Sequence, residues 1–191
     1  MFEKGFKQFL CRQDCTGVRD PIDQCVAYYF SQVMQAYSDY EIDAIHDFEM
    51  NHNRRPKVLI QTVAHISGAA YYYQRADVVD DPWPESQKIC GVCVHPRYGG
   101  WFALRGVLIF KDVIYSDLQQ TPPTDCVPGQ RQRISLLEKF NFNWKDWTFR
   151  DVIEAEQKYT EQQKDYFATR PGDRQKVIEA IKNSCQNSDN S

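Results

Sequence analysis

Apolar side chains follow a helical period in the segment after Pro21. They recur every three or four residues at Ile22, Val26, Tyr29, Val33 and Tyr37. Asp20 precedes the proline, and this pair is typical of a helix N-cap followed by the first helical residue. The pattern therefore predicts a helix of about four turns.

The middle of the chain is rich in β-branched and aromatic residues, which favour strands. Residues 42–50 and 56–66 are separated by the turn-like residues 51–55, so they are predicted to form a pair of strands. Residues 88–95 and 101–110 flank a turn with one proline and two glycines. They are predicted to form a hairpin of two buried strands at the centre of the sheet.

The last third returns to helical patterns after a connection with three prolines at residues 117–130. Residues 131–140 start a helical pattern, and Thr160 to Gln163 has the spacing of a capping box. Pro171 is expected to open a final helix with a short apolar face. That face consists of Val177, Ile178 and Ile181.

No linker or repeat divides the sequence, so we expect a single domain over residues 1–184 and a disordered tail over 185–191. A net charge of -3 provides no basic field for a polyanion, so nucleic acid is not an expected partner. No apolar run approaches the ~18 residues that span a bilayer, and the first residues lack a signal peptide's apolar core. We expect a cytoplasmic protein without a membrane partner.

Seven cysteines are present, an odd number, and most lie within apolar patterns. This suits reduced thiols, and no structural disulfide is expected. Cys90, Cys93 and His95 resemble a metal or redox cluster, but zinc would need a further ligand such as Cys126. Residues three apart on a strand point to opposite faces, so packed core thiols are the preferred interpretation, with Cys93 on the same face as His95.

The stretch from Ala64 to Arg75 joins small residues to three consecutive tyrosines. His65 lies in an apolar alternation, where a lone histidine is usually a core residue with satisfied hydrogen bonds. The small residues 67–70 allow close approach to the backbone, and tyrosines offer flat apolar rings with polar tips. The stretch therefore suits either a wall beside a broad ligand or a strand edge packed with tyrosines.

Three arginines lie in settings that suit anion binding. Arg105 interrupts an apolar strand, Arg150 ends a tryptophan-rich segment, and Arg174 follows Pro171 closely. Guanidinium groups in such places usually meet a carboxylate or a phosphate. Internal ion pairs are the alternative, and the candidate partners are Asp146, Asp151 and Asp173.

Five segments together closely resemble the cblC-type cobalamin-processing family. They are DPIDQCVAYYF, NRRPKVLIQTVAHISGAAYYYQR, GVCVHPRYGGWFALRGV, DCVP and FNFNWKDWTFRD. The resemblance runs from about Phe2 to Arg174. It implies an α+β, nitroreductase-like flavin-reductase fold: a mainly antiparallel sheet flanked by helices, N-terminally shortened relative to the family.

The resemblance also implies which residues surround cobalamin. They are Asp47, Val58, Leu59, Ile60, Gln61, His65, Tyr72, Tyr73, Gln74, Cys93 and Leu104. In the family, cobalamin is bound base-off and no protein histidine replaces the displaced base, so no protein ligand to the metal is expected. A cobalt that lacks a strong lower donor is easier to reduce.

Arg105, Arg150 and Arg174 match the family's arginines for the co-substrate glutathione, and FMN or FAD is a further expected ligand. Glutathione-dependent dealkylation transfers the upper alkyl group to the thiolate and leaves cob(I)alamin, whereas cyanocobalamin is decyanated reductively. Positive charge near the thiol would favour its thiolate.

A cblD-type adaptor, proteins of the methionine synthase pathway and a second copy of the chain are the partners that the resemblance implies. Cys90 stands where better-known members have serine, which leads us to expect some accompanying thiol oxidation. Two other functions are considered: a non-catalytic cobalamin carrier that delivers to an adaptor, and a flavin reductase that has lost the corrin. The arginine trio argues against the first and the tyrosine segment against the second.

Overall fold

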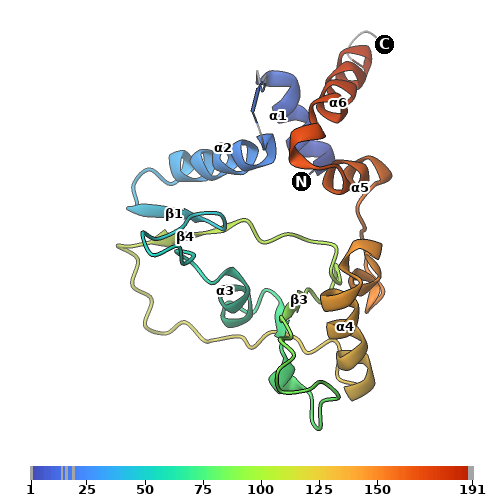
Figure 1. Cartoon of the computed structure of the whole chain (residues 1–191). Coiled ribbons are helices and arrows are strands. Elements are labelled where there is room, and N and C mark those ends of the chain that lie inside the picture. The colour runs from blue at the N-terminus through green and yellow to red at the C-terminus, as the bar shows by residue number, and fades with distance from the viewer. Residues whose placement is uncertain (1, 14, 16, 19, 189–191) are drawn as a thin grey trace. The chain divides into compact units, whose positions relative to one another are not determined.

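The chain divides into two compact units, which we describe separately (Figure 1). The computed structural model describes residues 2–13, 15, 17, 18 and 20–188. The terminal unit contains residues 1–42 and 159–191, and the central unit contains residues 43–158. The expected tail lies partly outside the described residues, because these end at Ser188.

The terminal unit is helical. Its elements are η1 (Phe2–Phe6), α1 (Lys7–Arg12), α2 (Pro21–Ala36), α5 (Glu161–Ala168), η5 (Pro171–Asp173) and α6 (Gln175–Ser188). The helix predicted after Asp20 is confirmed, with Pro21 as its first residue. Thr160 caps α5, because its hydroxyl accepts a hydrogen bond from the Gln163 amide. The predicted face of α6 packs into a core built around Phe6, Leu10 and Tyr166.

A disulfide bond in the terminal unit contradicts the expectation that there would be none. Cys11, in the last turn of α1, is disulfide-bonded. An odd cysteine count argues against complete pairing but leaves room for a single bond, which depends on packing rather than on spacing. Five other described cysteines form no disulfide bond: Cys15, Cys25, Cys90, Cys93 and Cys126.

The central unit mixes short strands with helices, so the α+β class is confirmed. Its elements are β1 (Ile42–His46), α3 (Ile60–Ile66), β2 (Tyr71–Tyr73), η2 (Arg75–Asp77), β3 (Val92–Val94), β4 (Gly106–Phe110), α4 (Gln130–Phe142), η3 (Trp144–Asp146) and η4 (Thr148–Asp151). Among the described residues the strands form two separate two-stranded sheets, β1 with β4 and β2 with β3. The pair of β2 and β3 is antiparallel.

The strand predicted over residues 56–66 is wrong, because its second half is the helix α3. The helix buries Ala64 at its inner face. It ends at Ser67 and Gly68, where Gly68 has a φ of +77° and its amide bonds the His65 carbonyl oxygen. A Ser-Gly pair after a short apolar segment is a signal for the end of a helix, whereas the β-branched composition of residues 56–66 favours a strand.

The predicted hairpin of residues 88–95 and 101–110 is also wrong. A tight turn does form, since the backbones of His95 and Gly99 exchange two hydrogen bonds of 2.9 Å. The chain then leaves the ladder because Gly100 packs on the backbone of Arg150. β3 therefore pairs with β2, and β4 pairs with β1.

The core of the central unit lies between the pair of β2 and β3 on one side and α4 on the other. Tyr73, Val94, Val127, Leu136 and Leu137 are its most deeply buried members. Within the part of the chain that the structure describes, no helix combines the length and the apolar composition needed to cross a bilayer.

Candidate functional site

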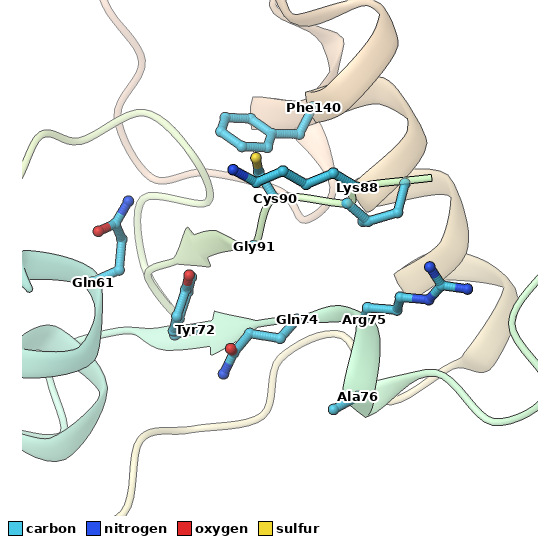
Figure 2. Close-up of a pocket in the computed structure, with 10 residues that line it drawn as sticks. Gln61, Tyr72, Gln74, Arg75, Ala76, Lys88, Cys90, Gly91 and Phe140 are labelled. Atoms are coloured by element: carbon cyan, nitrogen blue, oxygen red, sulfur yellow. The ribbon is translucent and has the colours of Figure 1, made fainter. Parts of the chain in front are cut away.

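A pocket of about 550 Å³ lies in the central unit beside strand β2 (Figure 2). The ten residues that line it are Gln61, Tyr72, Gln74, Arg75, Ala76, Lys88, Ile89, Cys90, Gly91 and Phe140. Its volume is in the range of sites for drug-sized ligands. Three of the residues expected to surround cobalamin, Gln61, Tyr72 and Gln74, are among them.

Tyr72 forms one wall of this pocket because Gly91 has no side chain. Tyr72 pairs with Cys93 across the two strands, and its ring lies over the Gly91 backbone. A Cβ at Gly91 would lie 2.5 Å from Cε2 of Tyr72 and 2.7 Å from the Tyr73 carbonyl oxygen, closer than side chains approach. The pKa of the Tyr72 phenol is raised, chiefly by burial, so the phenol stays a hydrogen-bond donor at neutral pH.

Cys93 lies behind this wall and does not line the pocket. It is buried in a small cluster with Ala64 and Ala70, and its thiol donates to the Gln61 carbonyl oxygen at 3.7 Å. Burial raises the pKa of the Cys93 thiol to about 12. Because the thiolate is the nucleophile, Cys93 is suited to packing rather than to thiol chemistry at neutral pH.

The segment from Lys88 to Gly91 also lines the pocket, and two side chains anchor its backbone. Asn141 of α4 accepts a hydrogen bond from the Cys90 amide at 2.8 Å and donates to the Cys90 carbonyl oxygen at 3.0 Å. Arg75 donates to the Gln87 carbonyl oxygen at 3.0 Å. The packed-core interpretation of Cys90 is wrong, because Cys90 is exposed and its side chain lines the pocket.

Tyr73 points away from the pocket, as strand alternation requires. It is fully buried, and its hydroxyl donates to Asp125 at 2.7 Å and accepts from the Val127 amide at 2.8 Å. Arg133 completes this network through an ion pair with Asp125 and a bond of 2.8 Å to the Val127 carbonyl oxygen. Burial and the Asp125 carboxylate raise the pKa of Tyr73. The three tyrosines thus divide between a pocket wall and the core.

His65 lies on α3 rather than on a strand, and its ring is engaged by the tyrosine segment. Nδ1 of His65 accepts a hydrogen bond of 3.1 Å from the Tyr72 amide. The Tyr71 ring meets the imidazole edge-on, with centroids 4.8 Å apart. His65 thus has a hydrogen-bond partner, and its bond to the Tyr72 amide helps to orient β2 beside the pocket.

Four further residues expected around cobalamin lie outside the lining of this pocket. Leu59 precedes α3 and is 63% exposed, and Ile60 begins the helix. Val58 is half-buried just before them. Leu104 packs against the cluster that contains Cys93.

Arg105 and Asp47 contact one another across the pair of β1 and β4. Their Nη1 and Oδ2 atoms are 3.5 Å apart, and each side chain is 24% exposed. The Asp47 amide also donates to the Arg105 carbonyl oxygen at 3.2 Å. The structure thus joins a residue expected near cobalamin to one expected to bind the co-substrate.

Aromatic rings surround the guanidinium of Arg150. Its Cζ lies 5.0 Å from the ring centroid of Trp147, 4.9 Å from that of Phe149 and 5.8 Å from that of Trp101. Nη1 donates to the Gly100 carbonyl oxygen. Cation–π contacts of this kind hold the arginine in a fixed place while leaving it positively charged.

Arg174 belongs to the terminal unit and is 8% exposed. Nη1 donates to Asp20 at 3.0 Å, Nε donates to the Thr169 carbonyl oxygen at 3.1 Å, and the guanidinium lies 4.6 Å from the Tyr166 ring centroid. The ion-pair alternative holds for this arginine, although the partner is none of the three aspartates suggested by the sequence. The same is true of Arg105, whose partner is Asp47.

Sequence reasoning missed Lys88, Ile89 and Phe140 as pocket residues. Phe140 lies on α4, about fifty residues or more from the other residues that line the pocket, so no local pattern linked them. Figure 2 shows the Tyr72 side chain pointing toward those of Lys88 and Cys90, with Phe140 beyond them, whereas the Gln74 side chain extends away from them. Among the described residues, no three histidine, cysteine or acidic side chains are placed to hold a metal ion.

Comparison with known proteins identifies relatives over nearly the whole chain. A model of the Methylmalonic aciduria and homocystinuria type C family (MMACHC) matches residues 1–178. A Bos taurus protein named cyanocobalamin reductase / alkylcobalamin dealkylase is 51% identical over 91% of this chain, and a Homo sapiens protein of the same name is 50% identical over 91%. The chain spans 62% of the bovine protein and 61% of the human one.

A solved structure resembles the fold closely. It is described as the crystal structure of a C. elegans B12-trafficking protein CblC, a human MMACHC homologue. It superposes with a TM-score of 0.85 at 29% identity, and the alignment covers 95% of this chain and 75% of that one.

Proposed function

Because the chain belongs to the methylmalonic aciduria and homocystinuria type C family, we propose that it binds cobalamin base-off and removes the upper axial ligand. The observation that carries the proposal is the pocket of about 550 Å³ beside the tyrosine strand. Gln61, Tyr72 and Gln74 line it from the segments expected to contact cobalamin. Two amides and a phenol supply hydrogen bonds, and Gly91 keeps the wall flat.

The proposed chemistry has two branches. In dealkylation, the glutathione thiolate attacks the alkyl carbon, the carbon–cobalt bond breaks, and both of its electrons stay on cobalt, which gives cob(I)alamin and an S-alkyl glutathione. In decyanation, an electron from reduced flavin or from a thiol reaches cobalt and cyanide leaves. Cys93 is not the proposed nucleophile, because burial raises its pKa to about 12.

The proposed role of Arg105 and Arg150 is to bind the carboxylates of glutathione or the phosphate of FMN or FAD. Arg150 keeps its charge among aromatic rings, which favours a role in anion binding. To bind the ligand's anionic group, Arg105 would give up or share its ion pair with Asp47, and Arg174 would do the same with its ion pair to Asp20. Accompanying thiol oxidation would follow if reduced cobalamin passed electrons to oxygen.

The same proposal includes the finer points of organisation. It comprises a nitroreductase-like fold, one cobalamin-processing domain over residues 1–184 and a tail over 185–191. The protein is further proposed to be cytoplasmic, to form a homodimer, and to have a cblD-type adaptor and methionine synthase pathway proteins as partners. Support comes from family membership and from the similarity to the C. elegans structure.

A non-catalytic carrier remains the second candidate because of one observation. Arg105 and Arg174 both have carboxylate partners within their own units, so their presence is explained without glutathione. A carrier would need only the pocket.

Anaerobic visible spectroscopy separates the two functions. We expect methylcobalamin to change to a base-off spectrum when the protein is added and then to cob(I)alamin when glutathione is added. Base-off binding without reaction would leave the carrier, and an unchanged spectrum would contradict both functions. Glutathione without protein is the control.

A further inference from the structure

We propose that Lys88 is the anion-recognition residue of the pocket and that its ligand is the phosphodiester of the cobalamin nucleotide tail. This inference rests on the proposed function. Lys88 is not among the residues that the resemblance places around cobalamin.

The charges that line the pocket suit an anion. Arg75 and Lys88 are its two cations, and none of its ten lining residues is acidic. Arg75 is already saturated: its guanidinium holds Asp81 through two bonds of 2.9 and 2.7 Å and donates to three backbone carbonyl oxygens. No described residue forms an ion pair with Lys88, so its ammonium is the cation available to a ligand.

The backbone on both sides of Lys88 is anchored, which limits where the ammonium can reach. Arg75 binds the carbonyl oxygen of Gln87, the residue before it. Asn141 binds both backbone groups of Cys90, two residues after it. In Figure 2 the Lys88 side chain extends along this wall toward Cys90 and faces Tyr72 across the pocket. A flexible stem on a fixed backbone suits a lysine that meets one anionic group.

The neighbouring donors fit a phosphodiester rather than a large apolar surface. Tyr72 keeps its phenolic proton, and Gln61 and Gln74 carry amide donors. A pocket of about 550 Å³ holds a drug-sized fragment, and cobalamin is larger than that. The pocket therefore takes one part of the substrate, and the nucleotide tail is the part with a negative charge.

Binding of two corrinoids tests this assignment, because cobinamide lacks the nucleotide and its phosphate. The variants are Lys88→Gln, Lys88→Arg and the control Lys139→Gln, which removes an exposed charge on α4 that does not line the pocket. Dissociation constants for cyanocobalamin and cobinamide are measured by quenching of tryptophan fluorescence at low and high salt. FMN and glutathione are titrated in parallel as the other sources of an anion.

We expect Lys88→Gln to weaken cyanocobalamin binding about two- to fivefold, as is usual for an exposed charge pair, and to leave cobinamide binding unchanged. Lys88→Arg should restore the affinity, Lys139→Gln should match wild type, and added salt should shrink the effect. Equal losses for both corrinoids, a loss confined to FMN or glutathione, or no loss at all would overturn the assignment. If the wild-type protein binds neither corrinoid, the proposed function itself fails.

Discussion

Replacing Arg174 by methionine distinguishes a structural arginine from a co-substrate ligand. The substitution keeps much of the stem but removes the donors to Asp20 and to the Thr169 carbonyl oxygen. Breaking a buried ion pair costs about 3–5 kcal/mol. Asp20 keeps 32% of its side-chain exposure, so water recovers part of that energy, and we expect a loss near the lower end, about 3 kcal/mol of unfolding free energy.

The assay is urea unfolding followed by far-ultraviolet circular dichroism. All four tryptophans lie in the central unit, so their fluorescence would report on the wrong unit, whereas helical ellipticity includes α2, α5 and α6. Arg170→Met is the matched control: Arg170 is exposed, and we expect a change within about 0.5 kcal/mol. The reasoning is refuted if Arg174→Met lowers the glutathione-dependent rate while its unfolding free energy stays within about 1 kcal/mol of wild type.

Three further predictions concern the central unit. Gly91→Ala should push the Tyr72 ring into the pocket and cost about 1–3 kcal/mol of stability by overpacking. Urea unfolding measures the loss of stability, and cobalamin titration measures the loss of affinity. If stability and affinity both stay unchanged, the contact between Gly91 and Tyr72 is contradicted. Tyr73→Phe should cost about 1–3 kcal/mol, because it removes the hydroxyl that bonds both Asp125 and the Val127 amide and leaves that amide only its longer bond of 3.3 Å to Asp125. Cobalamin affinity should be unchanged, and a loss of affinity at unchanged stability would count against a core role. Burial raises the pKa of Cys93 from 9.0 to about 12, so the contribution of the protonated thiol to stability should be complete below pH 9 and disappear as the pH rises toward 12. The free energies of unfolding of wild type and Cys93→Ala across this pH range measure that contribution. Parallel pH profiles of the two proteins would contradict the prediction.

Arg105, Arg150 and Arg174 were matched together to the family's co-substrate arginines, but their contacts in the structure differ. Arg150 keeps its charge within a ring of aromatic side chains, whereas Arg105 and Arg174 hold carboxylates of the chain itself. A carboxylate that binds Arg105 must compete with Asp47, and one that binds Arg174 must compete with Asp20.

The sequence by itself determined those features whose signals lie within a few residues. Pro21 after Asp20 marked the start of α2, Thr160 marked the start of α5, and apolar spacing marked the inner face of α6. Capping and helical periodicity act over one or two turns, so they can be recognised without knowing the fold. For the tyrosine stretch, the sequence left a wall beside a ligand and a strand edge packed with tyrosines open as alternatives.

Tertiary structure decided which distant segments meet. Residues 60–66 form a helix and β3 pairs with β2, while Gly68 and Gly100 lie against the backbones of Thr121 and Arg150, contacts that composition does not encode. From α4, Phe140 lines the pocket and Asn141 bonds the Cys90 backbone. The partners of Arg105 and Arg174 come from segments 58 and 154 residues away. Such contacts depend on the packing of the whole unit, because a side chain's partner is set by position in space and not by distance along the chain.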